Sequence, residues 1–228
     1  MLMSFPASRR MQTDGPMAEL PSGLGLSPSL DPLTHRFAVW AGRQRATCAD
    51  IGCGAGIATA AALVRGARVI AVDPDTSHIQ ALLAQLPVQQ YARVSVCSGQ
   101  LPFLKLDSAS LTSIHLARVF HLLDGVEIRQ SLHRCKDWLR ADGKLFISVL
   151  TPGGEHWSYF KREYERRCAN NDVWPGAADS RRPHLLDQHV LQRELTRAGF
   201  AIEELLEFPL AWDSSQICCG VVATPLVR

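Results

Sequence analysis

Glycines follow an acid at every second position in the segment from Asp50 to Gly56, which reads DIGCGAG. Glycine permits positive φ angles and lets a ligand come close to the backbone, so Gly52, Gly54 and Gly56 suit a tight binding turn. A short apolar run precedes the turn, and the Ala-rich segment Ile57 to Arg65 after it predicts a helix. The N–H groups at the start of that helix would face the turn, which favours a nucleotide-like ligand.

Two carboxylates narrow the choice of ligand. Dinucleotide-binding turns usually read G-x-G-x-x-G and hold a pyrophosphate at the helix N-terminus. Here the third glycine comes one residue early, Ile57 takes the place of the last glycine, and Asp50 would repel a pyrophosphate. Asp73 closes the next expected strand. A ligand with a sulfonium, an ammonium, ribose hydroxyls and no phosphate fits both acids, which favours S-adenosylmethionine over the nicotinamide cofactor of an oxidoreductase.

Strands and helices are expected to alternate along the rest of the chain. Asp124 and Asp187 are expected helix N-caps, because apolar residues recur at helical spacing after each of them. Strands that alternate with helices form a parallel sheet, whereas two closing strands with no helix between them must pair antiparallel. The pattern predicts a doubly wound, Rossmann-like α/β fold, in which a seven-stranded, mostly parallel sheet has an antiparallel last strand and helices on both faces. The expected strands are Ala46–Ile51, Val69–Val72, Val94–Cys97, Leu111–Leu116, Lys144–Leu150, Phe200–Phe208 and Ile217–Pro225.

From about Asp31 to its C-terminus, the chain resembles the class I S-adenosylmethionine-dependent methyltransferases. In that family a glycine turn like the one from Asp50 to Gly56 holds the methionine part of the cofactor, and the acid matching Asp73 binds both ribose hydroxyls. The loop around Gln100 resembles the adenine-side loop, with glutamine in place of the family's usual acid. The resemblance implies S-adenosylmethionine as the cofactor, bound by Asp50, Gly52, Cys53, Gly54, Gly56, Asp73, Pro74, Gln100, Leu101 and Arg118.

The segment after the fourth expected strand, Ala117 to Leu123, resembles the part of the family that faces the methyl-transfer centre. It contains the two predicted catalytic residues, Arg118 and His121. A carboxylate acceptor is already ionised and needs a cation such as Arg118 to orient it, whereas a hydroxyl or amine acceptor needs a base such as His121. Two alternatives stay open: His121 as a packing residue, and Arg118 as the partner of a neighbouring acid.

The segment 151–183, between the fifth strand and the last helix, is expected to form a lid-like insertion. Trp157, Phe160 and Tyr164 recur at helical spacing, so their aromatic face would line an apolar acceptor pocket or pack on the core. Asn171 to Gly176, together with Arg118 to His121, also resembles a small bacterial subgroup of methyltransferases whose substrate is undefined. The residues expected to bind the acceptor are His156, Trp157, Tyr164 and Trp174.

The composition of the chain indicates where the protein is located and which kinds of partner it is expected to lack. The chain has 228 residues, a net charge of +2 and seven cysteines without C-x-x-C spacing. These features predict one domain over residues 31–228 after a mobile arm over residues 1–30, in a reducing cytoplasm, with no metal and no nucleic-acid partner. No apolar run reaches the roughly 18 to 20 residues of a membrane span, so no membrane association is expected.

The sequence therefore predicts in-line methyl transfer from S-adenosylmethionine to a small-molecule acceptor, most readily at an oxygen or a carboxylate, in a cytoplasmic monomer or homodimer. Two alternatives keep the same fold. One is methylation of RNA or protein, which requires a continuous basic surface or an added recognition domain. The other is a non-catalytic protein that binds S-adenosylmethionine.

Overall fold

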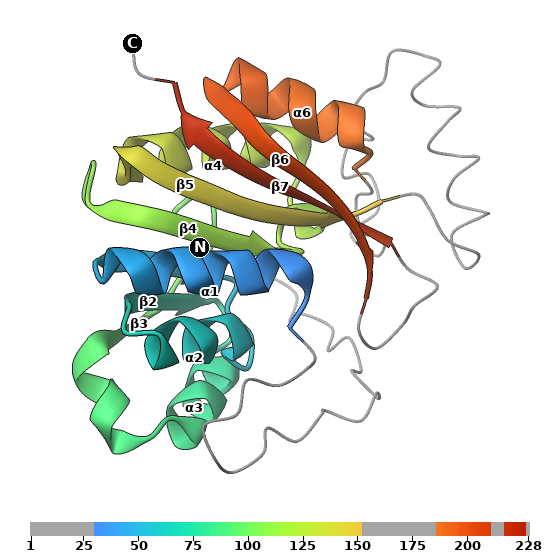
Figure 1. The fold of residues 1–228 in the computed structure, drawn as a ribbon. Coiled ribbons are helices and arrows are strands. Elements are labelled where there is room, and N and C mark those ends of the chain that lie inside the picture. Colours follow the sequence, from blue (N-terminus) through green and yellow to red (C-terminus); the bar gives the residue numbers. More distant parts are fainter. Residues whose placement is uncertain (1–29, 152–185, 211–216, 227–228) are drawn as a thin grey trace, which may run out of the picture.

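The computed structural model describes residues 30–151, 186–210 and 217–226, which are coloured in Figure 1. The expected arm at residues 1–30 and the expected lid at residues 151–183 lie almost entirely outside these ranges. The same is true of the expected acceptor-binding residues His156, Trp157, Tyr164 and Trp174, whose roles stay predictions. None of the described helices is long and apolar enough to cross a membrane.

Seven strands form one sheet in the order β3-β2-β1-β4-β5-β7-β6. The neighbours among β1 to β5 pair in parallel, and β7 runs antiparallel to both β5 and β6. The predicted mostly parallel sheet with an antiparallel last strand is therefore confirmed. The strands are β1 (Thr47–Ile51), β2 (Arg68–Asp73), β3 (Val94–Ser98), β4 (Leu111–Ala117), β5 (Leu139–Leu150), β6 (Phe200–Pro209) and β7 (Ile217–Pro225).

Helices cover both faces of the sheet, as predicted and as Figure 1 shows. Successive side chains of a strand point to opposite faces, so the sheet carries one apolar layer on each side. Phe37, Leu63 and Leu82 belong to the first layer, and Leu132 and Leu195 belong to the second. The first layer packs under α1 (Pro32–Gln44), α2 (Ile57–Val64) and α3 (Thr76–Gln85), and the second under α4 (Gly125–Trp138) and α6 (Gln188–Arg197).

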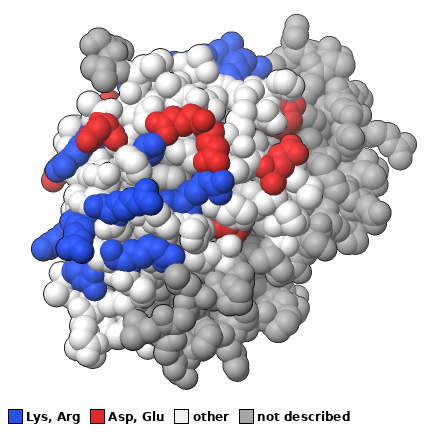
Figure 2. Space-filling view, viewed as in Figure 1, with Lys and Arg blue, Asp and Glu red and all other residues white. Residues whose placement is uncertain are grey.

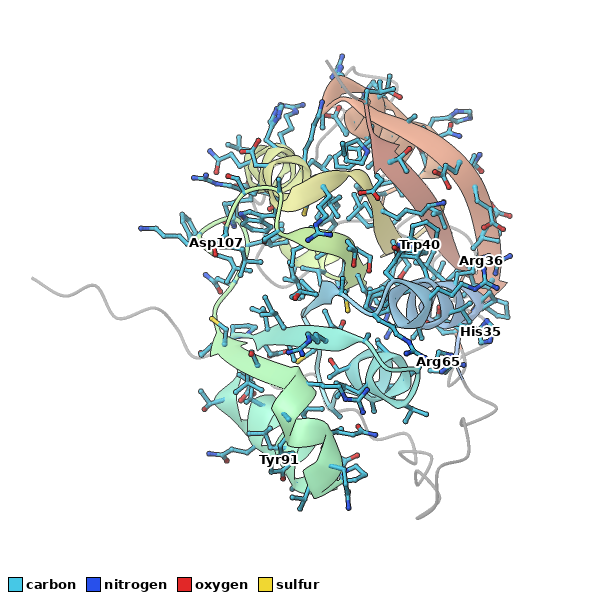
Figure 3. The ribbon with its side chains drawn as sticks, turned by 60° about the vertical axis from the view of Figure 1, so that its left-hand side comes forward. His35, Arg36, Trp40, Arg65, Tyr91 and Asp107 are labelled. Carbon is cyan, nitrogen blue, oxygen red and sulfur yellow. The ribbon has the colours of Figure 1, made fainter. Side chains whose placement is uncertain are left out.

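Helix α1 is absent from the elements predicted above, although its sequence carries the signals of a helix. The Asp31 side chain caps it by accepting hydrogen bonds from the N–H groups of Leu33 and Thr34, at 3.0 and 2.9 Å. Pro32 occupies the first helical position, where a missing N–H does no harm. On its outer side, Arg36 forms a bidentate pair with Glu204 of β6, which fixes α1 beside that strand (Figure 3).

The boundary between α4 and β5 differs from the prediction. The fifth strand was expected to start at Lys144, but α4 ends at Trp138 and β5 starts at Leu139. Leu139 is buried and pairs with Leu111 of β4, so tertiary pairing extends the strand beyond the local helix signal. The expected N-caps are confirmed, because the side chains of Asp124 and Asp187 accept backbone N–H groups of α4 and α6.

A buried carboxylate joins α6 to α4. Glu194 is only 2% exposed, and it accepts hydrogen bonds from Arg129 of α4 and from Arg193 and Arg197 of its own helix, each at 3.0 Å. Burial by itself raises the pKa of Glu194, but the hydrogen bonds and charges of Arg129 and Arg193 outweigh burial and lower the pKa. The cluster therefore stabilises the contact between the two helices while Glu194 is ionised.

Candidate functional site

The carboxyl ends of β1, β2 and β4 meet at one edge of the sheet, on the right in Figure 1. Ligands of open α/β sheets bind at this edge, because the strand order reverses direction there. The glycine turn after β1 is fixed against β2, since the N–H groups of Gly52 and Cys53 donate to the carbonyl of Val72 at 2.8 and 3.0 Å. The turn is thus a preformed part of the sheet edge.

The three glycines of the turn have positive φ angles but different surroundings. A Cβ at Gly52 would lie 2.5 Å from Val119, and a Cβ at Gly56 would lie 2.2 Å from Leu82 of α3. At Gly54, where φ is 52°, a Cβ would meet no heavy atom within 4 Å. Gly52 and Gly56 are therefore required for packing, while the backbone of Gly54 borders open space that a ligand can enter.

Helix α2 begins directly after Gly56, and no side chain caps its N-terminus. The first N–H groups of a helix have no partner within the helix, so they can bind acceptor atoms of a ligand. Together with the space at Gly54, they form a cradle of backbone groups that a side chain on the turn would fill.

Asp73, the last residue of β2, connects the turn to α3. Its Oδ2 accepts the N–H of Gly54 at 2.8 Å, and its Oδ1 accepts the N–H of Asp75 at 2.9 Å. The Nδ1 atom of His78 lies 3.1 Å from the same Oδ1. A carboxylate has about four acceptor sites and the two backbone N–H groups take one on each oxygen, so one site on each oxygen remains for His78 or for hydroxyl groups of a ligand. The following residue, Pro74, is exposed at the same edge.

Asp50 lies beneath the turn. Its side chain is 2% exposed, with Oδ2 accepting the hydroxyl of Thr59 at 2.7 Å and Oδ1 lying 2.8 Å from Nδ1 of His115. The sequence suggested that this carboxylate stands at the mouth of the strand, where a cationic ligand would meet it. In the structure the protein itself surrounds the carboxylate, so Asp50 supports the turn from below, and direct contact with a ligand stays a prediction.

The loop after β3 contributes residues of two kinds. Gln100 is exposed at the rim, whereas Leu101 is 2% exposed and belongs to the core. The N–H of Gly99 donates to the carbonyl of Asp73 at 3.3 Å, which ties the loop to the end of β2. Gln100 therefore lies at the same edge of the sheet as Asp73, as a contact with the adenine of the predicted cofactor requires.

Arg118 and His121 lie on the segment after β4. Arg118 has a φ of 56°, which is uncommon for a residue with a side chain and which Arg45 and Ala109 share. Its guanidinium lies 4.0 Å from the carboxylate of Asp31, so the acid partner considered above exists. The side chain of Arg118 is still 26% exposed. His121 is 7% exposed on a short 3-10 turn, Phe120–Leu122 (η2).

The thiols of Cys53 and Cys218 at this edge are protonated at neutral pH, and the predicted cofactor contact of Cys53 stays a prediction. Burial, followed by the negative charges of Asp50 and Asp73, raises the pKa of the Cys53 thiol far above its usual range. Burial also raises the pKa of Cys218 to about 11, although the positive charge of Arg118 opposes this shift. Among residues 30–151, 186–210 and 217–226, no three His, Cys, Asp or Glu side chains are grouped as metal ligands.

Some residues around the turn escape the sequence prediction. The rings of His115 and His78 contact the carboxylates of Asp50 and Asp73, although neither histidine is among the predicted site residues. Strand order would have revealed the first contact, because β1 and β4 pair in parallel with Asp50 opposite His115. The contact of His115 with Thr34 depends on helix α1, which is not among the expected elements, so the sequence did not predict it.

Comparison with known proteins agrees with the family resemblance found in the sequence. Residues 48–143 match the family model described as a methyltransferase domain. This range contains the glycine turn, Asp73, the loop at Gln100 and the segment with Arg118 and His121. No curated protein matches the chain by sequence.

Solved structures of low sequence identity share the fold. The 1,6-didemethyltoxoflavin-N1-methyltransferase of Burkholderia thailandensis, with bound 1,6-didemethyltoxoflavin and S-adenosylhomocysteine, has a TM-score of 0.64 at 20% identity, over 86% of this chain and 79% of that one. A methyltransferase of Methanosarcina mazei has a TM-score of 0.67 at 16% identity, over 88% and 100% of the two chains. An N-methyltransferase of Haemonchus contortus, in complex with phosphomonomethylethanolamine and S-adenosylhomocysteine, has a TM-score of 0.60 at 16% identity, over 80% and 49%. The predicted fold is thus confirmed.

Proposed function

We propose that this chain, a class I S-adenosylmethionine-dependent methyltransferase, transfers a methyl group to a small-molecule acceptor, at an oxygen or a carboxylate. The observation that carries the proposal is the cradle at Gly54, which has open space on one side and the carboxylate of Asp73 on the other. It supplies what an adenosine bearing an amino acid needs, namely a backbone that allows close approach, helix N–H donors and an acid for hydroxyl groups.

The residues of the cradle divide the work of holding the cofactor. Asp73 suits the two ribose hydroxyls, Gln100 suits the adenine edge, and the turn at Gly54 suits the methionine part. Bound S-adenosylmethionine supplies a methyl group on a sulfonium, which is already a good leaving group. The protein therefore has to orient the two reactants, exclude water and, for some acceptors, remove a proton.

The acceptor side is assigned to Arg118 and His121. Arg118 is a partly exposed cation beside the ends of β4 and β5, so it can orient an acceptor carboxylate. His121 is buried on the adjoining turn, where an imidazole can take a proton from a hydroxyl. The predicted lid residues His156, Trp157, Tyr164 and Trp174 stay part of this proposal as contacts to the acceptor.

A nitrogen acceptor is the second candidate. Two of the similar structures are N-methyltransferases that hold a small molecule with methylated or methylatable nitrogen. An amine is protonated at neutral pH and becomes a nucleophile only after losing a proton, so this candidate also depends on His121.

A polymeric acceptor is less well supported. On the face shown in Figure 2, Lys and Arg side chains gather mainly toward the end of the sheet where α1 terminates. Arg43, Arg45 and Arg68 are exposed there, at the amino ends of the strands. The cradle lies at the opposite edge, so on this face the described residues place no continuous basic surface beside the site.

Calorimetry tests the cofactor, and a labelled-methyl assay tests the acceptor. S-adenosylhomocysteine should bind the wild-type chain and NAD should not; tight binding of NAD would refute the proposal. With extracted cell metabolites, label should pass to a small molecule and not to RNA or protein. His121→Ala should keep S-adenosylhomocysteine affinity and lose the rate of label transfer. An unchanged rate would leave His121 as a packing residue.

A further inference from the structure

A chain of hydrogen bonds runs through the apolar layer between the sheet and α1. Its first link is the hydroxyl of Thr34, which donates to Oδ2 of Asp31 at 2.8 Å. The same Oγ1 atom lies 3.2 Å from Nε2 of His115, and Nδ1 of His115 lies 2.8 Å from Oδ1 of Asp50. The last link is the hydroxyl of Thr59, which donates to Oδ2 of Asp50 at 2.7 Å. We refer to these five residues as the His115 network.

Water has little access to the centre of the His115 network. Asp50, Thr59, His115 and Thr34 are 1%, 0%, 3% and 4% exposed, respectively. The ring of Phe37 from α1 stacks on the imidazole at a centroid distance of 4.8 Å. Buried polar groups must find their hydrogen-bond partners within the protein, so the protons of the network can be counted.

The count begins at Thr34, whose hydroxyl carries one proton and has two polar neighbours. Asp31 is a carboxylate that already accepts two backbone N–H groups, and a carboxylate can only accept, so the proton of Thr34 points to Asp31. The Oγ1 atom of Thr34 is then an acceptor toward His115, and Nε2 must carry a proton. Nδ1 faces the carboxylate of Asp50 and must carry a proton too.

We propose that His115 is a buried imidazolium that positions Asp50 beneath the cofactor turn and couples this turn to α1. Both ring nitrogens act as donors, so the ring carries a positive charge beside Asp50. A lone carboxylate at 1% exposure would be strongly unfavourable, and the imidazolium neutralises it in place. His115 touches neither reactant and is therefore a positioning residue.

The coupling extends to the acceptor side. Asp31 caps α1 and lies 4.0 Å from the guanidinium of Arg118, the residue assigned to the acceptor. The network thus joins the turn at Asp50, the start of α1 and the neighbourhood of Arg118. This coupling rests on the proposed function, whereas the charge of His115 does not.

The charge is tested on the wild-type protein without ligand, by ¹⁵N NMR of the histidine side chains at pH 7.5. An ordinary imidazole, with a pKa of about 6.5, is mostly neutral at this pH. Among the described residues, the groups that neighbour the His115 ring are the carboxylate of Asp50, the hydroxyl of Thr34, the stacked ring of Phe37 and Phe146, its partner on β5. We expect both ring nitrogens of His115 to show the shifts of protonated nitrogen. A signal from an unprotonated ring nitrogen would overturn the proposal.

The coupling is tested by S-adenosylhomocysteine binding to three threonine variants. Thr34→Val removes the hydroxyl that His115 donates to, and Thr34→Ser keeps it. Thr112→Val is the matched control, because Thr112 is a buried threonine of β4, the strand of His115, and its hydroxyl donates to the carbonyl of Thr47, outside the network. We expect Thr34→Val to weaken binding about tenfold and the other two variants to stay within about twofold of wild type.

The binding results distinguish a failure of the coupling from a failure of the proposed function. If Thr34→Val binds S-adenosylhomocysteine as tightly as Thr112→Val, the coupling is refuted. If Thr34→Ser binds S-adenosylhomocysteine as weakly as Thr34→Val, the weaker binding comes from lost packing and not from the lost hydroxyl, and the coupling is again refuted. A wild-type chain that binds no S-adenosylhomocysteine refutes the proposed function and the coupling with it, while the NMR spectrum still decides the charge of His115.

Discussion

Replacing Asp73 with alanine tests the assignment of the cofactor cradle most directly. The carboxylate accepts the N–H groups of Gly54 and Asp75 in the protein and is proposed to accept two ribose hydroxyls in the complex. A hydrogen bond to a charged group contributes about 1.5 to 3 kcal/mol, so the loss of two such bonds weakens binding by about 3 kcal/mol or more. We therefore expect the Kd for S-adenosylhomocysteine to rise at least about 100-fold.

The effect on folding should be smaller than the effect on binding. The N–H groups of Gly54 and Asp75 lie at the sheet edge, where water can replace the lost acceptor, so the free energy of unfolding should fall by only about 1 kcal/mol. Thermal unfolding measures this term, and titration calorimetry of the folded variant measures the Kd.

Asp75→Asn is the matched control, two residues away. Asp75 caps α3 through its side chain, and asparagine is an equally good N-cap, so this variant should keep both stability and affinity. A Kd for Asp73→Ala within about threefold of wild type would refute the cradle.

Three further predictions concern the glycine turn, the buried Glu194 and the thiol of Cys218. Gly54→Ala carries only the strain of its positive φ, since a Cβ there meets no heavy atom within 4 Å, and should weaken S-adenosylhomocysteine binding. Gly56→Ala adds a clash with Leu82 to the same backbone strain and should lower the melting temperature further. Equal melting temperatures would contradict the packing argument. Glu194→Gln should lower the free energy of unfolding by about 1 to 3 kcal/mol at pH 7. Because the pKa of Glu194 is lowered in the folded state, this stabilisation is present above the ordinary glutamate range and disappears as the pH falls through the folded pKa, so wild type and variant should converge in acid denaturation. With a pKa of about 11, the Cys218 thiol should resist alkylation at pH 8 in the folded protein, as peptide mass spectrometry can show; rapid labelling would contradict this.

Local patterns were sufficient for most of the fold. The turn at Gly52, Gly54 and Gly56, the N-caps Asp124 and Asp187, and the two closing strands all follow from chemistry within a few residues along the chain. Helix α1 carries equally local signals at Asp31 and Pro32, so neighbouring residues encode it as well.

The start of β5 shows where local patterns fail. Asp142 and Gly143 resemble a helix end, but Leu139 is already paired with Leu111 of β4. Burial of Leu139 in the core outweighs the turn signal, because intrinsic propensities are small compared with the free energy of burying a leucine.

The sequence by itself determined the type of domain and the residues of the cradle, since glycine spacing and the acids Asp50 and Asp73 are read along a single βαβ unit. Only the tertiary structure decided which way those acids face. Asp50 and His115 are separated by 65 positions, and they meet because β4 lies beside β1 in the sheet. Strand order depends on packing across the whole domain, so a carboxylate that looks like a ligand contact in the sequence lies in the structure beside a buried histidine.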